Sequence, residues 1–192
     1  LLPLLWIALA LAWGGRQRSV DAAGVPTLLV LRVFHQDANV GALFDDVIER
    51  WRTVGHTVLI AGTDVVGQTL DAADLFDFLD RRLAARFVRR AADVPQRLAA
   101  FDWQPDAERR WRVNECYCRD NTWQAALDAL VARSDVVLTD LRGFSAANAG
   151  CRYELEVLTH APHVRRVVVL YDGHTDRTTA AQDTAAAAAD RF

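Results

Sequence analysis

Two amino acids are missing from this sequence, which has no methionine and no lysine, so all 22 basic residues are arginine. Because Leu1 stands where an initiator methionine is usual, we expect the 192 residues to be a piece of a longer product. The formal net charge of −3 gives the chain no basic field that would attract nucleic acid. A nucleic-acid partner is therefore not expected.

Cysteine is scarce, and its spacing indicates neither a disulfide framework nor a metal site. The three cysteines, Cys116, Cys118 and Cys151, are odd in number and are expected to be reduced thiols of a cytosolic domain. No second cysteine pair or spaced histidines follow the C-x-C pair, so no metal is predicted. The glycine-rich dinucleotide fingerprint and the Walker phosphate loop are also missing, which disfavours a classical Rossmann dehydrogenase and an NTPase.

The first part of the chain is strongly apolar. Residues 1–13, LLPLLWIALALAW, carry no charge and are followed by two glycines and then by Arg16 and Arg18. A membrane-spanning helix needs about 20 apolar residues, so we interpret residues 1–18 as the end of a transmembrane helix with its basic flank, and residues 19–26 as a linker. The arginines then mark the cytoplasmic side, which predicts a cytoplasmic domain held at the cell membrane. A buried core helix and a signal-peptide core are the alternatives.

Residues 27–192 alternate between strand and helix patterns, and 52% of the whole sequence is hydrophobic, enough for a sizeable core. The expected strands cover residues 27–34, 57–61, 136–139 and 164–171, and the expected helices cover residues 43–54, 121–131, 147–160 and 178–192. The stretch at about 64–123 is interpreted as a helical insertion. We therefore predict an α/β domain with a parallel sheet and helices on both faces.

Polar residues gather where the strand at 136–139 ends, and ligands of open α/β sheets bind beyond the carboxyl ends of strands. The ligand-binding candidates are Asp140, Arg142, Gly143, Phe144, Ser145 and Asn148, and the following helix adds a second carboxylate, Glu154. For Asp140 and Arg142 the plain alternative is a turn contact or an ion pair with each other. For Ser145 it is the helix N-cap, and for Glu154 it is a surface charge.

These side chains suit a nucleotide. A carboxylate hydrogen-bonds ribose hydroxyls and stabilises the positive charge that develops when a glycosidic bond breaks. A helix N-terminus and a guanidinium together bind phosphate. If Asp140, Arg142 and Glu154 share one site, we expect it to bind a nucleotide or to cleave its N-glycosidic bond.

The helix that carries Glu154 resembles part of a known family. The strand VVLTD and the following SAANAGCRYEL resemble the segment after the third strand of TIR domains, where a serine-bearing loop leads into a helix with a Trp-Cys-x-x-Glu-Leu motif. Cys151, Glu154 and Leu155 match that motif, and Gly150 stands in place of its tryptophan. The resemblance implies a TIR-like, flavodoxin-like fold. Because this glutamate is catalytic in TIR domains that cleave NAD, it also makes Glu154 the catalytic candidate.

Three functions stay open at this point. The wider pattern resembles bacterial membrane proteins in which transmembrane helices precede a TIR-like domain, so we favour a membrane-anchored cytoplasmic module for signalling or nucleotide binding. The alternatives are an NAD(P) or nucleoside glycohydrolase that uses Glu154, and a non-catalytic interaction scaffold that forms a homo-oligomer. No cofactor is expected to be required, and NAD or a related nucleotide would act as substrate or ligand.

Overall fold

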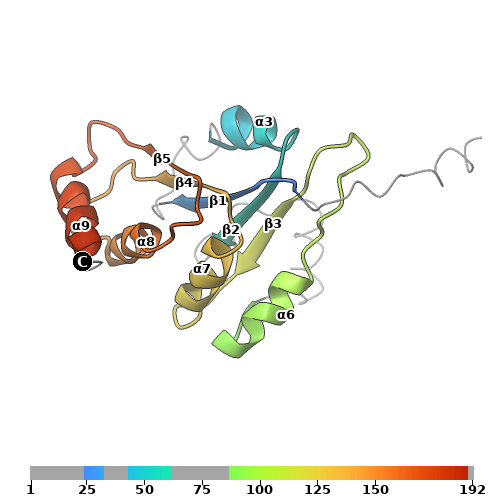
Figure 1. Cartoon of the computed structure of the whole chain (residues 1–192), viewed down its shortest axis with the longest axis horizontal. Coiled ribbons are helices and arrows are strands. Elements are labelled where there is room, and N and C mark those ends of the chain that lie inside the picture. The colour runs from blue at the N-terminus through green and yellow to red at the C-terminus, as the bar shows by residue number, and fades with distance from the viewer. Residues whose placement is uncertain (1–23, 33–42, 62–86, 190–192) are drawn as a thin grey trace, which may run out of the picture.

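Five parallel strands form the centre of the computed structural model, which describes residues 24–32, 43–61 and 87–189 (Figure 1). The strands are β1 (Thr27–Arg32), β2 (His56–Ala61), β3 (Val113–Tyr117), β4 (Val136–Asp140) and β5 (Arg166–Leu170). Their order across the sheet is β3-β2-β1-β4-β5, and every neighbouring pair is parallel. The predicted α/β class with a parallel sheet is confirmed.

The amino-terminal predictions fall largely outside this description. The expected end of a transmembrane helix, residues 1–18, and most of the expected linker, residues 19–26, precede the first described residue. Within the three described stretches, no helix has the length and apolar character that crossing a membrane requires. The described part of the chain begins with a turn at Gly24 that leads directly into β1.

The prediction of a helical insertion at about 64–123 is wrong at β3, a strand that lies inside that stretch. The described part of that stretch holds a 3-10 turn, η2 (Ala91–Asp93), a short helix, α6 (Val94–Ala99), and then β3 itself. Its residue Asn114 is buried, yet its amide group is satisfied at both ends: it accepts from the Asp102 N–H at 2.9 Å and donates to the Asp102 carbonyl at 3.0 Å. A polar residue is therefore tolerated in the core, and no apolar run marks the strand.

Helices cover both faces of the sheet (Figure 1). Apolar residues of α6, of α7 (Trp123–Val131) and of α8 (Ala149–Thr159) pack on one face in a single large cluster with side chains of all the strands from β1 to β4. On the other face, a smaller cluster joins Ile48 of η1 (Phe44–Ile48) and Trp51 of α3 (Glu49–Trp51) to β1, β2 and β4. The last helix, α9 (Arg177–Ala189), lies beside α8. Two layers of helix therefore enclose the central strands.

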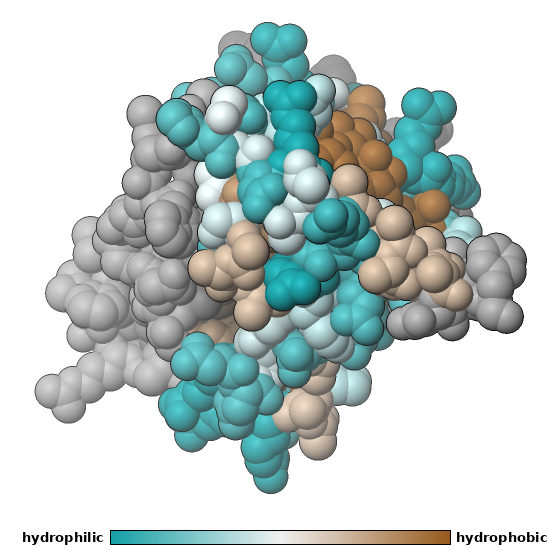
Figure 2. Space-filling model, turned by 90° about the vertical axis from the view of Figure 1, so that its left-hand side faces the viewer, coloured by the Kyte–Doolittle hydropathy of each residue, from teal (hydrophilic) through white to brown (hydrophobic). Residues whose placement is uncertain are grey.

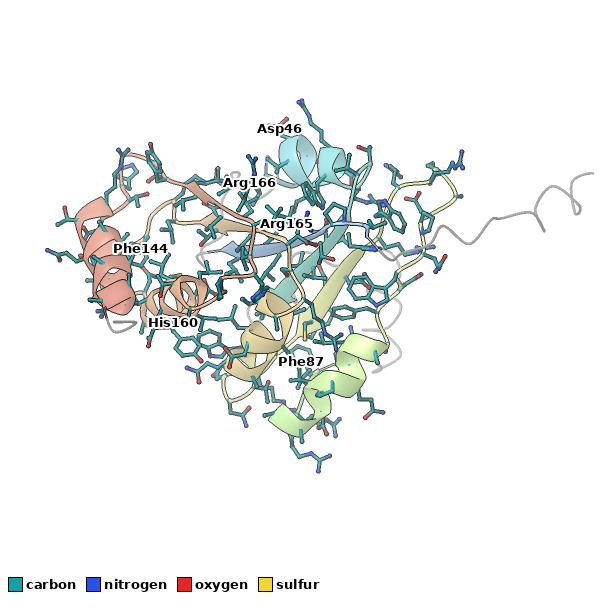
Figure 3. All side chains as sticks on the ribbon, viewed as in Figure 1. Asp46, Phe87, Phe144, His160, Arg165 and Arg166 are labelled. Atoms are coloured by element: carbon teal, nitrogen blue, oxygen red, sulfur yellow. The ribbon has the colours of Figure 1, made fainter. Side chains whose placement is uncertain are left out.

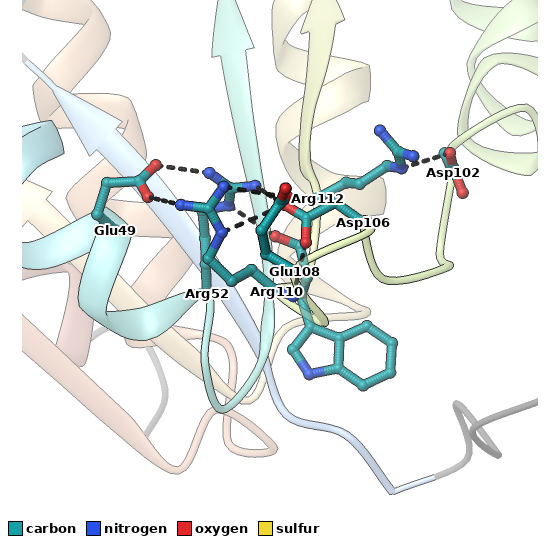
Figure 4. A network of polar contacts seen from close by, with 8 residues as sticks. Glu49, Arg52, Asp102, Asp106, Glu108, Arg110 and Arg112 are labelled. Atoms are coloured by element: carbon teal, nitrogen blue, oxygen red, sulfur yellow. Dashed lines mark hydrogen bonds and ion pairs between the residues drawn. The ribbon is translucent and has the colours of Figure 1, made fainter. Parts of the chain in front are cut away.

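An ionic network ties the loop before β3 to α3 (Figure 4). Arg52 contacts Glu49 at 2.6 Å and Asp106 at 2.8 Å, and its Nε donates to the Trp111 carbonyl at 2.8 Å. Arg110 reaches the second oxygen of Glu49 at 3.1 Å. These contacts fix a loop inside the stretch for which the sequence predicts a helical insertion, and they lie at the amino ends of the strands, away from the candidate site.

Candidate functional site

The strand order reverses between β1 and β4, and Asp140 lies at that reversal. From β1 the chain adds β2 and β3 on one side, and it later adds β4 and β5 on the other side. Asp140 ends β4 and is the register partner of Arg32, which ends β1. Ligands of open α/β sheets bind outside the carboxyl ends of strands at such a reversal, so this edge is the natural place for a site. We call residues 140–148 together with Glu154 the β4 rim.

Asp140 and Arg142 form a two-pronged ion pair at the start of the rim. Arg142 Nε donates to Oδ1 of Asp140 at 2.8 Å, and Arg142 Nη2 donates to Oδ2 at 2.6 Å. The backbone N–H of Arg142 also reaches Oδ1, at 3.2 Å. Asp140 is only 7% exposed, so this paired guanidinium is what makes a carboxylate tolerable at the sheet edge. The pairing that the sequence offered as the plain alternative is therefore present.

The loop in the middle of the rim packs on buried apolar side chains. Phe144 (Figure 3) is 0% exposed and packs in a small cluster with Leu141, Cys151 and Leu155, which we call the rim cluster. Ala180 of α9 packs against the same cluster. Phe144, a predicted ligand-binding residue, thus lies beneath the loop and supports its shape.

The loop after β5 is hydrogen-bonded to the rim through Asp172. Oδ1 of Asp172 accepts from the Gly143 N–H at 3.3 Å, from the His174 N–H at 2.9 Å and from the Thr175 hydroxyl at 3.0 Å. The same hydroxyl contacts the Leu141 carbonyl at 2.8 Å. Desolvation works against the charge of Asp172, but these hydrogen bonds outweigh it and hold the pKa of Asp172 below its usual range. Asp172 is not among the residues that the sequence pattern puts forward for the site.

Ser145 and Asn148 lie on the outer side of the rim. The Oδ1 atom of Asn148 accepts from the Ser145 N–H at 2.8 Å and from the Ser145 hydroxyl at 3.0 Å. The helix α8 begins at Ala149, so Asn148 and not Ser145 occupies the N-cap position. Asn148 makes no side-chain cap hydrogen bond with α8, because its oxygen is turned back toward Ser145. The two side chains form a closed local turn whose Ser145 face is exposed.

Glu154 is buried in α8 and not a surface charge, since it is 5% exposed. Among the described residues, none hydrogen-bonds or pairs with its carboxyl group. Burial raises the pKa of Glu154 from 4.5 to about 8. At neutral pH the neutral acid therefore predominates, and it has a proton to donate.

The thiol of Cys151 lies close enough to both carboxyl groups of the rim to be affected by their charges. Burial raises the pKa of Cys151 to about 12, and the negative charges of Glu154 and, to a smaller extent, Asp140 contribute to the rise. Both carboxyl groups therefore lie within electrostatic range of one buried sulfur atom. The fold brings Asp140, Arg142 and Glu154 to the same region, whereas Ser145 and Asn148 stay on its exposed margin. Sequence reasoning used Cys151 only as a motif match and missed this position.

Gly143 is the residue of the rim whose backbone demands glycine, with φ +72. Nothing lies within 4 Å of a Cβ placed on it, so Gly143→Ala is expected to cost about 1–2 kcal/mol of unfolding free energy through backbone strain alone. Gly173→Ala, in the facing loop, also meets open space but does not have the left-handed backbone. Denaturant unfolding should show a loss for the first variant and none for the second. Equal losses of unfolding free energy in the two variants would contradict the requirement for glycine at position 143.

The described residues hold no group of three or more histidine, cysteine or acidic side chains arranged for a metal ion. What the rim offers is a paired carboxylate and guanidinium, a buried neutral acid and an exposed hydroxyl.

Comparison with protein-family models, with curated proteins and with solved structures finds no match to this chain.

Proposed function

We propose that this chain is a nucleotide-binding module of the TIR-like kind, anchored to the cell membrane by residues 1–18 with its α/β domain on the cytoplasmic side. The observation that carries the proposal is the burial of Glu154, without a hydrogen-bonding or ionic partner among the described residues, in the helix that follows the Asp140–Arg142 pair. A buried polar group without a partner is costly for the folded state, and a ligand that supplies the partner recovers that cost. Such groups are concentrated at functional sites.

Ribose and phosphate are the chemical groups that match the rim. As a neutral acid, Glu154 can donate a hydrogen bond to a ribose hydroxyl, and it can accept a hydrogen bond in return. Arg142 offers a guanidinium that is already oriented by Asp140, and guanidinium groups favour phosphate oxygens. The exposed Ser145 hydroxyl adds a neutral donor at the margin. A nucleotide carries both groups, which is why it fits better than a simple sugar or a free anion.

Glycohydrolase activity on NAD(P) or a nucleoside is the second candidate, favoured by the pKa of Glu154. A carboxyl group with a pKa of about 8 is poised to change its charge close to neutral pH. The cationic nicotinamide ring of a bound NAD, and the positive charge that develops on the ribose, would both favour loss of that proton. The resulting carboxylate would stabilise the transition state of bond cleavage.

A nucleotide panel, tested on the full chain, separates these functions. At about 100 times its Kd, a binding nucleotide is expected to add about 2.7 kcal/mol of stability in thermal denaturation, with nicotinamide release from NAD followed by chromatography. Glu154→Ala should lose the added stability, while Glu154→Gln keeps much of it because its amide still donates a hydrogen bond. Release by the wild-type chain that Glu154→Gln abolishes would establish the glycohydrolase.

The matched control is Glu156→Ala, two residues away on the exposed side of the same helix. It should respond to nucleotides as the wild-type chain does. If no nucleotide stabilises the full chain, the proposed binding function is refuted. An equal loss in Glu154→Ala and Glu156→Ala would remove the rim from consideration as the site.

A further inference from the structure

The strand β5 is exposed on both of its faces, unlike the other strands. Val167, Val168 and Val169 are 43%, 45% and 42% exposed, and because successive side chains of a strand point to opposite faces, neither face is covered. Tyr171, just after the strand, is also exposed. Figure 2 views this side of the molecule and shows a patch of hydrophobic atoms at its upper right.

The two edges of the sheet differ. At the β3 edge, a bridge from Val88 to Cys118 continues the ladder, and the Val88 N–H donates to the Tyr117 carbonyl at 2.8 Å. At the other edge β5 is the last strand, and within the described residues it is paired with β4 alone. Edge strands with uncharged, apolar side chains readily accept another strand. Among the described strands, the β5 edge is therefore the open one.

The backbone of β5 identifies the residues that would accept a further strand. The Leu170 carbonyl accepts from the Leu141 N–H at 2.8 Å, so Leu170 directs its backbone groups toward β4. Backbone direction alternates along a strand, so Val168 also turns toward β4, while Val167 and Val169 turn their N–H and C=O groups outward. A second strand would bond to these two residues.

The charges around β5 favour a second copy of the same strand in antiparallel orientation. Arg165 and Arg166 are exposed at its beginning (Figure 3), while Tyr171 and Asp172 follow its end. In an antiparallel pair about a two-fold axis, the basic end of each copy meets the acidic and aromatic end of the other. A parallel arrangement would place arginine beside arginine. No charged side chain interrupts residues 167–171.

We propose that two copies of this chain associate through an antiparallel β5–β5 contact centred on Val168. Val167 of one copy then exchanges both backbone hydrogen bonds with Val169 of the other, and Arg165 lies opposite Tyr171. Because the contact is two-fold and uses up the open edge of both copies, it ends at a dimer with a continuous ten-stranded sheet. The proposal does not depend on the rim binding a nucleotide.

Cysteine cross-linking of the full chain tests this contact. In the proposed register the two Val168 side chains face each other, at a Cβ separation of about 4.5–5.5 Å, which is close to what a disulfide needs. With Val168→Cys, air oxidation catalysed by copper–phenanthroline should couple the two thiols, with loss of two electrons and two protons to oxygen. The native cysteines are buried and should stay reduced. Dimers are expected on a non-reducing gel.

The matched control is Val54→Cys, which places a thiol at another exposed valine, in the turn before β2. Val168→Cys should form dimers at least about tenfold faster, because pairing raises the effective concentration of the thiols. Equal rates would overturn the proposal, since they indicate random collision. No dimer, together with a Val168→Cys thiol that resists a maleimide, would also overturn it and assign the edge to another segment of this chain.

A second pair of variants measures association without cross-linking, as the dimer fraction against protein concentration. Val168→Asp sets two carboxylates against each other at the centre of the contact and should abolish the dimer near neutral pH. Val168→Thr keeps the β-branched shape and should retain it. A dimer that survives Val168→Asp, or a chain that stays monomeric at every concentration, would refute the β5 contact.

Discussion

Glu154→Gln is expected to be more stable than the wild-type chain at alkaline pH and nearly equal to it at acidic pH. In the wild-type chain the carboxyl group has a pKa of 4.5 when unfolded and of about 8 when folded. The folded state therefore holds the proton more tightly, and its stability falls as pH rises through this window. The slope reaches about 1.4 kcal/mol per pH unit, so between pH 4.5 and about 8 the difference accumulates to about 5 kcal/mol, nearly all of which is present at about pH 9.

Denaturant titrations at a series of pH values measure this difference directly. Glutamine has the shape of the protonated acid but no proton to lose, so its variant should show a flatter dependence on pH across the window. Glu156→Gln changes the same kind of residue on the exposed side of α8 and should keep the wild-type slope. Parallel pH profiles for the wild-type chain and Glu154→Gln would mean that Glu154 titrates normally and is reached by water.

Arg142→Ala is expected to lose about 2–3 kcal/mol of unfolding free energy, because it leaves Asp140 buried without its paired guanidinium. The expected loss of unfolding free energy is smaller than for a fully buried ion pair, because solvent reaches part of the Arg142 side chain. Asp140→Asn should cost less, because Arg142 can then turn toward water. Chemical denaturation of both single variants and of the double variant gives the coupling energy between the two side chains.

The double variant Arg142→Ala with Asp140→Asn should recover part of the loss, because no buried charge is then left unpaired. Arg119→Ala removes an exposed arginine at the end of β3 and should change stability by no more than about 0.5 kcal/mol. Additive effects of the two rim substitutions would show that the ion pair does not hold the rim together.

The sheet was largely predictable because four of its strands are dense apolar runs. β1 and β5 lie inside the expected segments, and β2 and β4 each extend one residue beyond theirs. β3 was not predictable, because Asn114 and Glu115 interrupt its apolar pattern. What makes Asn114 acceptable is a pair of hydrogen bonds to Asp102, twelve residues earlier. Such tertiary compensation leaves no periodic trace in a sequence.

For the rim, the sequence identified candidate residues but did not show how deeply each side chain is buried. Asp140 was predictable because a strand that ends in a carboxylate is visible in the sequence. The burial of Glu154 and Phe144 depends on how α8 and α9 pack, which pattern alone does not fix. Asp172 lies 29 positions from Gly143, so their contact appears only once β4 and β5 are neighbours.

The attachment of α9 makes the rim part of a larger cooperative unit. Ala180 of α9 packs against the rim cluster, and Asp183 of α9 pairs with Arg152 of α8 at 2.7 Å. The N–H of Asp176, the residue before α9, donates to the Phe144 carbonyl at 2.9 Å. Opening α9 would thus uncover Phe144 and release the loop that carries Arg142. α9 therefore stabilises the rim. A force that pulled α9 away from α8 would act on the carboxyl end of β4 before it acted on β3 at the other edge of the sheet.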